Sequence, residues 1–354
     1  MKIVTFEVAT PLGKVTRLGA WIEHDGAPRV VDLNAAFTSY LITCTDEPTP
    51  REYAALRIPP DMVGWLRAGA EGRRAAMAAI DYAQSQADRC GHQGARLLYD
   101  RSEVRLLAPL PRPSSFRAFS IYEEHMTRAQ VTPMTGGDRP YRKSVHWFRT
   151  PPYYKGSCTS FAGPDDPVPF PYYTEKLDLE LEIAIVIGRE ARNLSVAEVP
   201  SCIAGYAMLI DSSCRDGYGR EPFGPTKRKD FHTALGPWLV TPEELDIQNL
   251  ACSIEADGKV CFAGSTAAPH SFTPAQLVAY ASDNETLYPG DLLATGTISY
   301  GCSMDHHHWF RVGQEVTFRI EGLGAMTLKI VAGERVVEHV RGMQGLLPIP
   351  PDLQ

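Results

Sequence analysis

The stretch KLDLELEIAIVIG, Lys176 to Gly188, alternates acidic and aliphatic residues and then becomes wholly apolar. Side chains two residues apart in a β-strand point to the same face, so this alternation predicts a strand with two different faces. One face carries the aliphatic residues Leu177, Leu179, Leu181 and Ile183, and the other carries Asp178, Glu180 and Glu182. The sequence therefore predicts a row of three acids along one side of a single strand.

Two interpretations of this acid row are open. A row of acids can be the solvated face of an amphipathic strand. The strand continues as AIVIG (184–188), where both faces are apolar, and this favours burial on both sides. Buried carboxylates need a cation, because an unpaired charge is costly to remove from water.

Asp211 is the candidate for a further ligand of such a cation. It ends the apolar run YAMLI (206–210), and we expect the end of that strand to present its carboxylate to a cleft. A ligand set made only of oxygens suits a hard divalent ion such as Mg2+, Mn2+ or Ca2+ and argues against structural zinc.

The composition excludes several classes of partner. The chain has 354 residues, and its formal net charge of -7 supplies no basic field for nucleic acid or an anionic membrane. No apolar run approaches the roughly 20 residues that span a bilayer, and the N-terminus lacks a signal-peptide core. We expect a cytoplasmic protein that binds neither nucleic acid nor membranes.

The eight cysteines form no CxxC pair and are too dilute for a disulfide scaffold, so we expect buried free thiols. A nucleophilic cysteine, with Cys214 beside Asp211 as the candidate, is the alternative.

The distribution of strand, helix and proline signals predicts two domains. The first 40 residues have the pattern of short strands separated by turns, and 60–89 is rich in alanine with apolar residues at helical spacing. The proline-rich APLPRP (108–113) is expected to separate an N-terminal β domain with a helical segment, residues 1–110, from a larger domain, residues 111–354.

The larger domain is predicted to consist chiefly of strands, so the fold class is mainly β (α+β). The expected strands are 177–187, 251–264, 291–298, 315–320 and 326–338. The stretch 114–171 has little periodicity and is expected to form loops over a site.

Two segments contain histidines that are candidates for chemistry. DHHHWF, Asp305 to Phe310, suggests a transition-metal site, but consecutive residues cannot all converge on one ion, so a solvated loop near a pocket is the favoured interpretation. His125 in SIYEEHM stands beside aromatic and acidic residues. A structural or surface histidine is the alternative to a catalytic one there.

Five motifs, in this chain order, resemble the fumarylacetoacetate hydrolase family: KLDLELEIAIVIG, AGYAMLIDSSCRD, KDFHTALGPWLV, PGDLLATGTIS and IEGLG. The resemblance spans about Ser114 to the C-terminus. The N-terminal RLGAWIEHDGAPRVVDLN (17–34) is similar to the small β domain of the longer, fumarylacetoacetase-like members. The resemblance implies a small N-terminal SH3-like β domain followed by a mixed β-roll catalytic domain of the fumarylacetoacetate hydrolase type.

The resemblance also implies roles for individual residues. Glu180, Glu182 and Asp211 match the metal-binding acids, with Mg2+ as the first candidate and Mn2+ or Ca2+ as alternatives. Lys229 falls on the active-site lysine, and His125 falls where the general-base histidine is expected.

The carboxylate that orients His125 is left open among Glu124, Asp305 and Glu315. Contacts with the substrate are implied or considered for Tyr154, Tyr218, Thr233 and Thr297. The chain departs from fumarylacetoacetase in AFSIYEEH (118–125), which lacks the acidic ligand before the histidine, and in Tyr218, where the family often has glutamine.

The activity that the resemblance implies is hydrolysis of a carbon–carbon bond. The expected enzyme is a divalent-metal-dependent hydrolase that acts on a 1,3-diketone or acylpyruvate-type acid, such as a fumarylacetoacetate-like compound, in aromatic-compound catabolism. The alternatives are a decarboxylase, isomerase, aldolase or hydratase that uses a metal-stabilised enolate, and a non-catalytic binding module. A homodimer is expected because the resembled family assembles through its catalytic domain.

Overall fold

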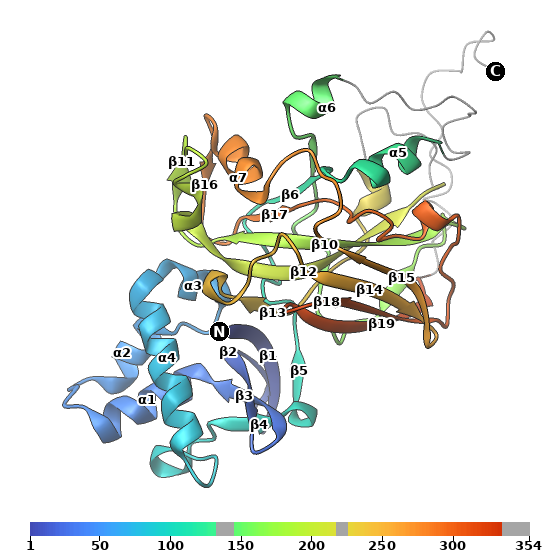
Figure 1. The fold of residues 1–354 in the computed structure, drawn as a ribbon. Coiled ribbons are helices and arrows are strands. Elements are labelled where there is room, and N and C mark those ends of the chain that lie inside the picture. The colour runs from blue at the N-terminus through green and yellow to red at the C-terminus, as the bar shows by residue number, and fades with distance from the viewer. Residues whose placement is uncertain (132–144, 217–225, 335–354) are drawn as a thin grey trace, which may run out of the picture.

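The computed structural model describes residues 1–131, 145–216 and 226–334. Figure 1 shows a large sheet through the middle of the molecule, a smaller sheet beside it, and helices grouped around the N-terminal strands. None of the helices in these ranges is long and apolar enough to cross a membrane.

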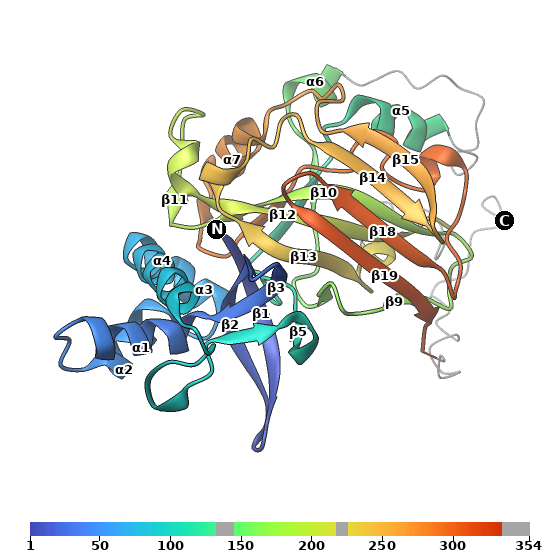
Figure 2. The same cartoon turned by 60° about the horizontal axis from the view of Figure 1, so that its bottom comes forward.

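The N-terminal region combines antiparallel strands with four helices. Its strands are β1 (Lys2–Thr10), β2 (Gly13–His24), β3 (Ala27–Asp32), β4 (Leu98–Asp100) and β5 (Val104–Leu106). Its helices are α1 (Leu33–Cys44), α2 (Pro50–Arg57), α3 (Met62–Arg67) and α4 (Gly69–Ser85). Figure 2 shows the helices gathered on one side of β1 to β3.

Helices α1 and α2 lie in a region where the sequence analysis predicts no helix. Asp32 caps α1, because its Oδ1 accepts a hydrogen bond of 3.0 Å from the Ala35 backbone N–H. The buried residues of α1 include Leu33, Phe37 and Leu41, which recur every four positions and form one apolar stripe. The helical spacing is therefore present in the sequence, although it directly follows a strand pattern.

The remaining strands form most of the large sheet and all of the smaller one. Strands β6 (Phe116–Phe119), β7 (Tyr153–Lys155), β8 (Phe161–Ala162), β10 (Leu177–Ile187), β12 (Ile203–Cys214), β13 (Thr233–Val240) and β17 (Leu292–Ala294) complete the large sheet. Its order is β4-β3-β2-β1-β13-β12-β10-β17-β6-β7, with β5 on β1 and β8 on β13.

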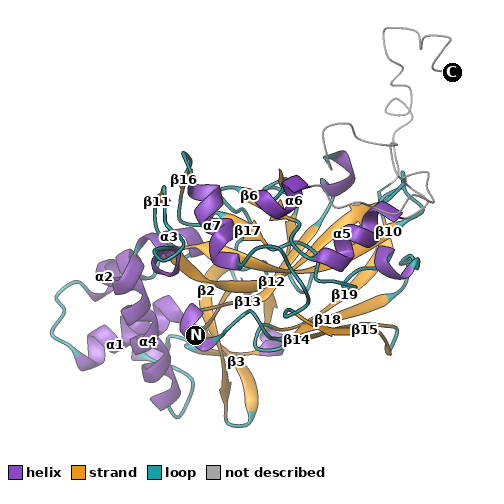
Figure 3. Ribbon diagram, turned by 45° about the horizontal axis from the view of Figure 1, so that its top comes forward, coloured by secondary structure: helices purple, strands orange, loops and turns teal. Residues whose placement is uncertain are grey.

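The smaller sheet has the order β15-β14-β18-β19-β9. Its strands are β9 (Val168–Phe170), β14 (Ala251–Ala256), β15 (Lys259–Ser265), β18 (Glu315–Ile320) and β19 (Gly324–Ala332). A short pair, β11 (Ala191–Arg192) with β16 (Thr286–Leu287), stands apart. Helices α5 (Glu123–Val131), α6 (Val145–Arg149) and α7 (Pro274–Ser282) are drawn over the β10, β17 and β6 part of the large sheet (Figure 3).

The large sheet crosses the domain boundary that the sequence predicts. Strand β1 pairs with β13, with Lys2 opposite Val240 and Ile3 opposite Leu239. One apolar core also joins the two regions, since it contains Ile3 together with Leu209. The division into 1–110 and 111–354 stays a prediction, and edge-to-edge strand pairing holds the two parts together.

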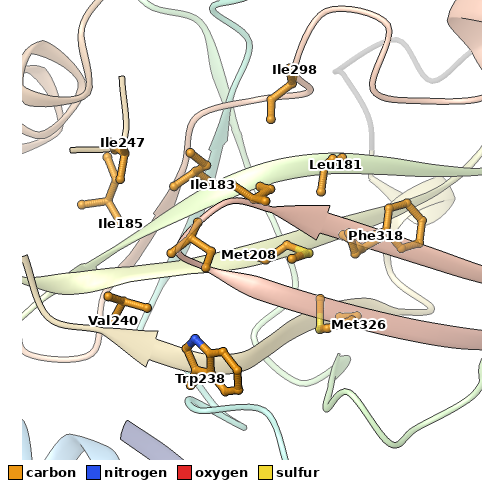
Figure 4. Packing of buried hydrophobic residues seen from close by; sticks show 14 of the residues in the cluster. Leu181, Ile183, Ile185, Met208, Trp238, Val240, Ile247, Ile298, Phe318 and Met326 are labelled. Atoms are coloured by element: carbon orange, nitrogen blue, oxygen red, sulfur yellow. The ribbon is translucent and has the colours of Figure 1, made fainter. Parts of the chain in front are cut away.

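Strand β10 spans the predicted residues 177–187, and all eleven are buried. Its leucine face packs in the core formed with the smaller sheet, where Leu181 and Ile183 lie above Phe318 and Met326 (Figure 4). Beyond the acids, the opposite face belongs to the second core. The interpretation of the acid row as a solvated face is therefore wrong.

Three further expectations need correction. The described residues of 114–171 are not chiefly loop, because they include β6 to β9 with α5 and α6, and residues 132–144 of that stretch lie outside the described part. Asp211 lies inside β12, which continues to Cys214 because the small polar residues after Asp211 keep their ladder partners on β10. The expected strand 251–264 is a hairpin, in which Asp257 and Gly258 have φ values of 48° and 78°.

The mainly β (α+β) class and the expected strand 315–320 are confirmed. The expected strand 291–298 is limited to β17, and the expected strand 326–338 corresponds to β19. The last residues of that expected strand, 335–338, lie outside the described residues.

Candidate active site

The register of three adjacent strands brings the candidate metal ligands together. In the antiparallel pair of β10 and β12, Glu180 lies opposite Asp211, and Asp211 lies opposite Thr233 of β13. Residues directly opposite each other share a face of the sheet, and Glu182 joins them two residues along β10. One carboxylate oxygen from each of Glu180, Glu182 and Asp211 lies within 4.8 Å of the other two.

Lys229 is a cation that contacts two members of this carboxylate cluster. Its Nζ donates a hydrogen bond of 2.7 Å to Asp211 Oδ2 and also bonds Glu180 Oε2. Tyr154 donates its hydroxyl proton to the same Asp211 Oδ2 at 2.6 Å. Asp211 Oδ1 is buried and has no hydrogen-bond partner among the described residues, so the cluster keeps a free acceptor.

Glu180 and Glu182 are held by groups from β12 and from the loop after β17. Ser213 Oγ donates to Glu180 Oε2 at 2.8 Å, and Thr297 Oγ1 donates to Glu180 Oε1 at 2.9 Å. The Gly296 backbone N–H donates to Glu182 Oε2 at 3.1 Å. Gly296 has φ +94°, and a Cβ there would lie 2.4 Å from the carbonyl oxygen of Phe119. Only glycine therefore allows the two backbone segments to lie this close together.

The neighbouring cations stabilise the charged forms of the three carboxyls of the cluster to different extents. Burial, together with repulsion from Asp211 and Glu180, raises the pKa of the Glu182 carboxyl well above its usual range. Burial likewise raises the pKa of Asp211, although Lys229 opposes this. Burial acts on Glu180 too, but Arg215 and Lys229 outweigh it and hold the pKa well below its usual range. An additional cation would therefore stabilise the charged forms of the buried Glu182 and Asp211 carboxyls.

His125 and Asp305 form a buried pair beside the cluster. His125 lies near the start of α5, and its Nδ1 is 3.2 Å from Asp305 Oδ1. Its other ring nitrogen, Nε2, is 3.4 Å from Glu180 Oε1. Burial lowers the pKa of His125, but the Asp305 carboxylate outweighs that effect, so the net shift is upward. The Tyr300 backbone N–H donates to Asp305 Oδ2 at 2.9 Å and fixes the carboxylate.

The other candidates for orienting His125 lie elsewhere. The Glu124 side chain is 45% exposed, and its Oε2 is 3.4 Å from the Tyr300 hydroxyl. Glu315 is an exposed residue at the start of β18. Asp305 is thus the one of these three carboxylates that the structure places against the imidazole.

Of the four residues predicted to contact substrate, three lie at the carboxylate cluster and one lies outside the described residues. Thr297 bridges Glu180 and Glu182, with 3.3 Å to Glu182 Oε1. Thr233 is buried in the row with Asp211. Tyr218 lies outside the described residues.

Sequence reasoning missed Arg215 and the separate role of Asp178. Arg215 donates to Asp178 Oδ2 at 2.7 Å and also bonds Glu180. Asp178 accepts a further bond of 2.7 Å from the Ser303 backbone N–H, so this acid anchors the segment that carries Asp305. The signal for Arg215 is its spacing, because it follows Asp211 and Ser213 at intervals of two along and just beyond β12.

The alternative of a nucleophilic Cys214 finds no support in the structure. Cys214 is buried, and burial raises the pKa of its thiol to about 12. A thiol with such a pKa supplies very little thiolate near neutral pH.

Comparisons with known proteins agree with this fold. The family model for the fumarylacetoacetate (FAA) hydrolase C-terminal domain matches residues 115–331. Mitochondrial oxaloacetate tautomerase Fahd2a of Rattus norvegicus is 30% identical over 239 residues, which cover 66% of this chain and 72% of the relative.

Two solved structures share the fold over nearly the whole chain. Maleylpyruvate hydrolase from Sphingobium sp. SYK-6, in complex with manganese(II) and pyruvate, has a TM-score of 0.64 at 22% identity and covers 94% of this chain and 100% of its own. The 5-carboxymethyl-2-hydroxymuconate delta-isomerase of Mycobacterium smegmatis has a TM-score of 0.61 at 22% identity, with the same coverage. Since the family model spans more than half of the chain, and the resemblance seen in the motifs is confirmed, the chain belongs to the fumarylacetoacetate hydrolase family.

Proposed function

We propose that the chain is a divalent-metal-dependent hydrolase that cleaves a carbon–carbon bond in a 1,3-diketone or acylpyruvate-type acid, such as a fumarylacetoacetate-like compound of aromatic catabolism. The observation that carries this proposal is the meeting of three elements at one buried place. These are the carboxylate cluster, the Lys229 ammonium and the His125–Asp305 pair.

Glu180, Glu182 and Asp211 fit a hard divalent cation, with Mg2+ as the first candidate and Mn2+ or Ca2+ as alternatives. The support is the buried Asp211 Oδ1 without a partner among the described residues and the raised pKa of Glu182. When bound, such a cation supplies positive charge that favours the enolate form of a keto acid. The manganese and pyruvate in the Sphingobium enzyme agree with a hard cation and a small keto acid.

The chain's own residues supply the proton transfers and a fixed positive charge. We assign His125 Nε2 as the base, because it faces the cluster while Nδ1 faces Asp305. It takes a proton from water, and the hydroxide adds to a substrate carbonyl carbon. The adjacent carbon–carbon bond then breaks, the carbonyl fragment leaves as a carboxylic acid, and the other fragment takes its bonding electrons as an enolate. His125 returns the proton to that enolate, while Lys229 stabilises negative charge on oxygen.

A second candidate is a tautomerase or isomerase, favoured by the name of the rat relative and by that of the Mycobacterium smegmatis structure. Such a reaction moves a proton between carbon and oxygen without adding water, and the His125–Asp305 pair is equipped for it. A decarboxylase, aldolase or hydratase shares the enolate. A non-catalytic binding module would not require the buried pair.

A substrate panel decides among these candidates. Acylpyruvates, linear and cyclic β-diketones, and oxaloacetate should be incubated with Mg2+, Mn2+ or a chelator. Cleavage products are analysed by mass spectrometry in water labelled with 18O, and keto–enol interconversion of oxaloacetate is followed by ultraviolet absorbance. Hydrolysis predicts metal-dependent cleavage with label in one carboxylic acid. Tautomerisation of oxaloacetate without any cleavage would assign the second candidate, and metal-independent cleavage would contradict the first.

We also propose a homodimer, on the basis of the family resemblance. Light scattering should give about twice the chain mass of 39.0 kDa, and a mass near that of one chain at micromolar concentration would contradict the proposal. The cytoplasmic location and the lack of nucleic-acid and membrane partners stay predictions.

A further inference from the structure

We propose that His125, Cys302 and Asp305 form a second metal site, which binds a soft divalent cation of the Zn2+ type and blocks His125. This inference goes beyond the proposed function, and the metal binding itself does not depend on that function. The three side chains are buried, and one donor atom from each lies within 4.8 Å of the other two.

The spacing of the donors matches tetrahedral zinc. With Zn–N and Zn–O bonds of about 2.0 Å and a Zn–S bond of about 2.3 Å, a tetrahedral site places N and O about 3.3 Å apart and N and S about 3.5 Å apart. His125 Nδ1 is 3.2 Å from Asp305 Oδ1 and 3.7 Å from Cys302 Sγ. An ion can therefore enter with small side-chain shifts. Nitrogen, sulfur and oxygen donors together also select zinc over magnesium.

The proposed site is distinct from the carboxylate cluster. The two share no residue, and they face opposite nitrogens of one imidazole ring. His125 Nδ1 faces Cys302 and Asp305, whereas Nε2 faces Glu180. A hard ion at the oxygen cluster and a soft ion at Nδ1 therefore do not compete for the same donor atoms.

The local charge favours a cation. Asp178 and Glu180 place carboxylate oxygens within 4.8 Å of Cys302 Sγ. Together with Asp305 they supply three carboxylates, and the Arg215 guanidinium pairs with the first two. Both Asp305 oxygens lie near His125 Nδ1, Oδ1 at 3.2 Å and Oδ2 at 3.3 Å, and the Tyr300 backbone N–H donates to Oδ2. This bond orients a ligand in the manner of supporting groups around known metal sites.

A cavity reaches the proposed site at Cys302, the one of the three ligands that lines it. It has a volume of about 380 Å3, and its lining includes Cys302, Cys261, His306 and His308. The last two belong to the DHHHWF segment, which sequence analysis placed near a pocket. The cavity provides a route for the ion and room for a water molecule as the fourth ligand.

Binding at this site would remove the base. When Nδ1 coordinates a metal, the neutral imidazole carries its proton on Nε2, so that nitrogen no longer accepts one from water. The Cys302 thiol proton passes to solvent as the thiolate binds. Asp305 would then be a ligand and no longer an acceptor for His125. Inhibition by micromolar Zn2+ in the presence of saturating Mg2+ is the functional consequence, and this part rests on the proposed function.

Co2+ substitution tests the binding directly. Co2+ bound by a thiolate in tetrahedral geometry gives near-ultraviolet charge-transfer and strong visible absorption, whereas an oxygen-only site gives neither. With Mg2+ in excess, the wild-type chain should show these bands on Co2+ addition. Cys302→Ser and Cys302→Ala should lose them, and Zn2+ affinity from chelator competition should fall by at least about tenfold.

Cys261→Ser is the matched control, because Cys261 lines the same cavity but does not belong to the proposed ligand set. It should keep the bands. Their absence from the wild type, their persistence in a folded Cys302 variant, or their loss in Cys261→Ser would each overturn the site. Circular dichroism identifies folded variants. Two replacements of Cys302 are made so that the test still stands if one of them does not fold.

Turnover measurements separate this inference from the proposed function. Each variant is compared with its own rate without Zn2+, and the Cys302 variants should resist Zn2+ inhibition. A chain that shows the thiolate bands but no substrate turnover keeps the metal site and loses the proposed hydrolase.

Discussion

His125 and Asp305 lie 180 positions apart in the sequence, yet Nδ1 of the first is 3.2 Å from Oδ1 of the second. The pair is buried, and the other ring nitrogen of His125, Nε2, lies 3.4 Å from Glu180 Oε1. Asp305 reaches this position because the Asp178 carboxylate holds the Ser303 backbone N–H. The strand that carries the candidate metal ligands thus also positions the carboxylate behind the candidate base.

Replacing His125 tests its role as the base. His125→Ala should lower turnover by about two to four orders of magnitude, the usual contribution of a general base. Mg2+ affinity from calorimetry should stay within a few-fold of wild type, because His125 is outside the oxygen cluster. Glu124→Gln, at the exposed neighbour, is the control and should leave turnover nearly unchanged. Parallel loss of metal binding and turnover in His125→Ala would make it a ligand or a structural residue.

Two acids in the same row of β10 should respond differently to amide replacement. Glu182→Gln should abolish measurable Mg2+ binding at millimolar concentration, because a neutral amide removes one of three ligands. Asp178→Asn should keep Mg2+ affinity within about tenfold, because its partners are Arg215 and Ser303. It should still lower turnover, since Asp305 is displaced. Both variants are measured by calorimetry, with Glu315→Gln as control. Normal Mg2+ binding by Glu182→Gln would contradict its assignment as a ligand.

Lys229 should be required for stability when divalent metal is removed. In chelator, Lys229→Met leaves Asp211 without its ammonium partner and deprives Glu180 of one, so the free energy of unfolding should fall by about 3–5 kcal/mol. Mg2+ should restore part of this loss by supplying charge to the native state. Urea unfolding with and without Mg2+ measures both effects. Lys227→Met, at an exposed lysine two residues earlier, should change stability by less than about 0.5 kcal/mol.

His232 should make the protein less stable at mildly acidic pH. Burial lowers its pKa to about 4 from an ordinary value of 6.5, despite the nearby Asp166 carboxylate. Between these values the unfolded chain binds more protons than the native one, so its contribution to stability is full above about pH 6.5 and is lost as pH falls toward 4.

The slope of this effect is measurable by urea unfolding across about pH 4.5 to 7. His232 contributes at most about 1.4 kcal/mol per pH unit to the slope of the unfolding free energy against pH. His232→Asn should remove this contribution. It keeps a polar partner for Ser212 Oγ, which lies 2.8 Å from His232 Nδ1. His307→Asn, at an exposed position, should leave the slope unchanged. Identical slopes for wild type and His232→Asn would contradict the prediction.

Sequence by itself determined the strand 177–187 and the side on which its acids lie. Both depend on local alternation, because successive side chains of any strand point to opposite faces. The wholly apolar second half also favoured burial, and the chain order of five motifs identified the family. These features are all contained in short stretches of chain.

Tertiary structure decided which acids meet which partners. Asp211 faces Glu180 because of the β10–β12 register, although the end of its apolar run predicted a strand terminus. The same register places Arg215, which directly follows β12, beside Asp178. The choice of Asp305 over Glu124 as the partner of His125 depends on loop packing between distant parts of the chain. Local periodicity specifies the face on which a side chain lies, whereas contacts between separate elements are fixed only when sheet register and loop packing form together.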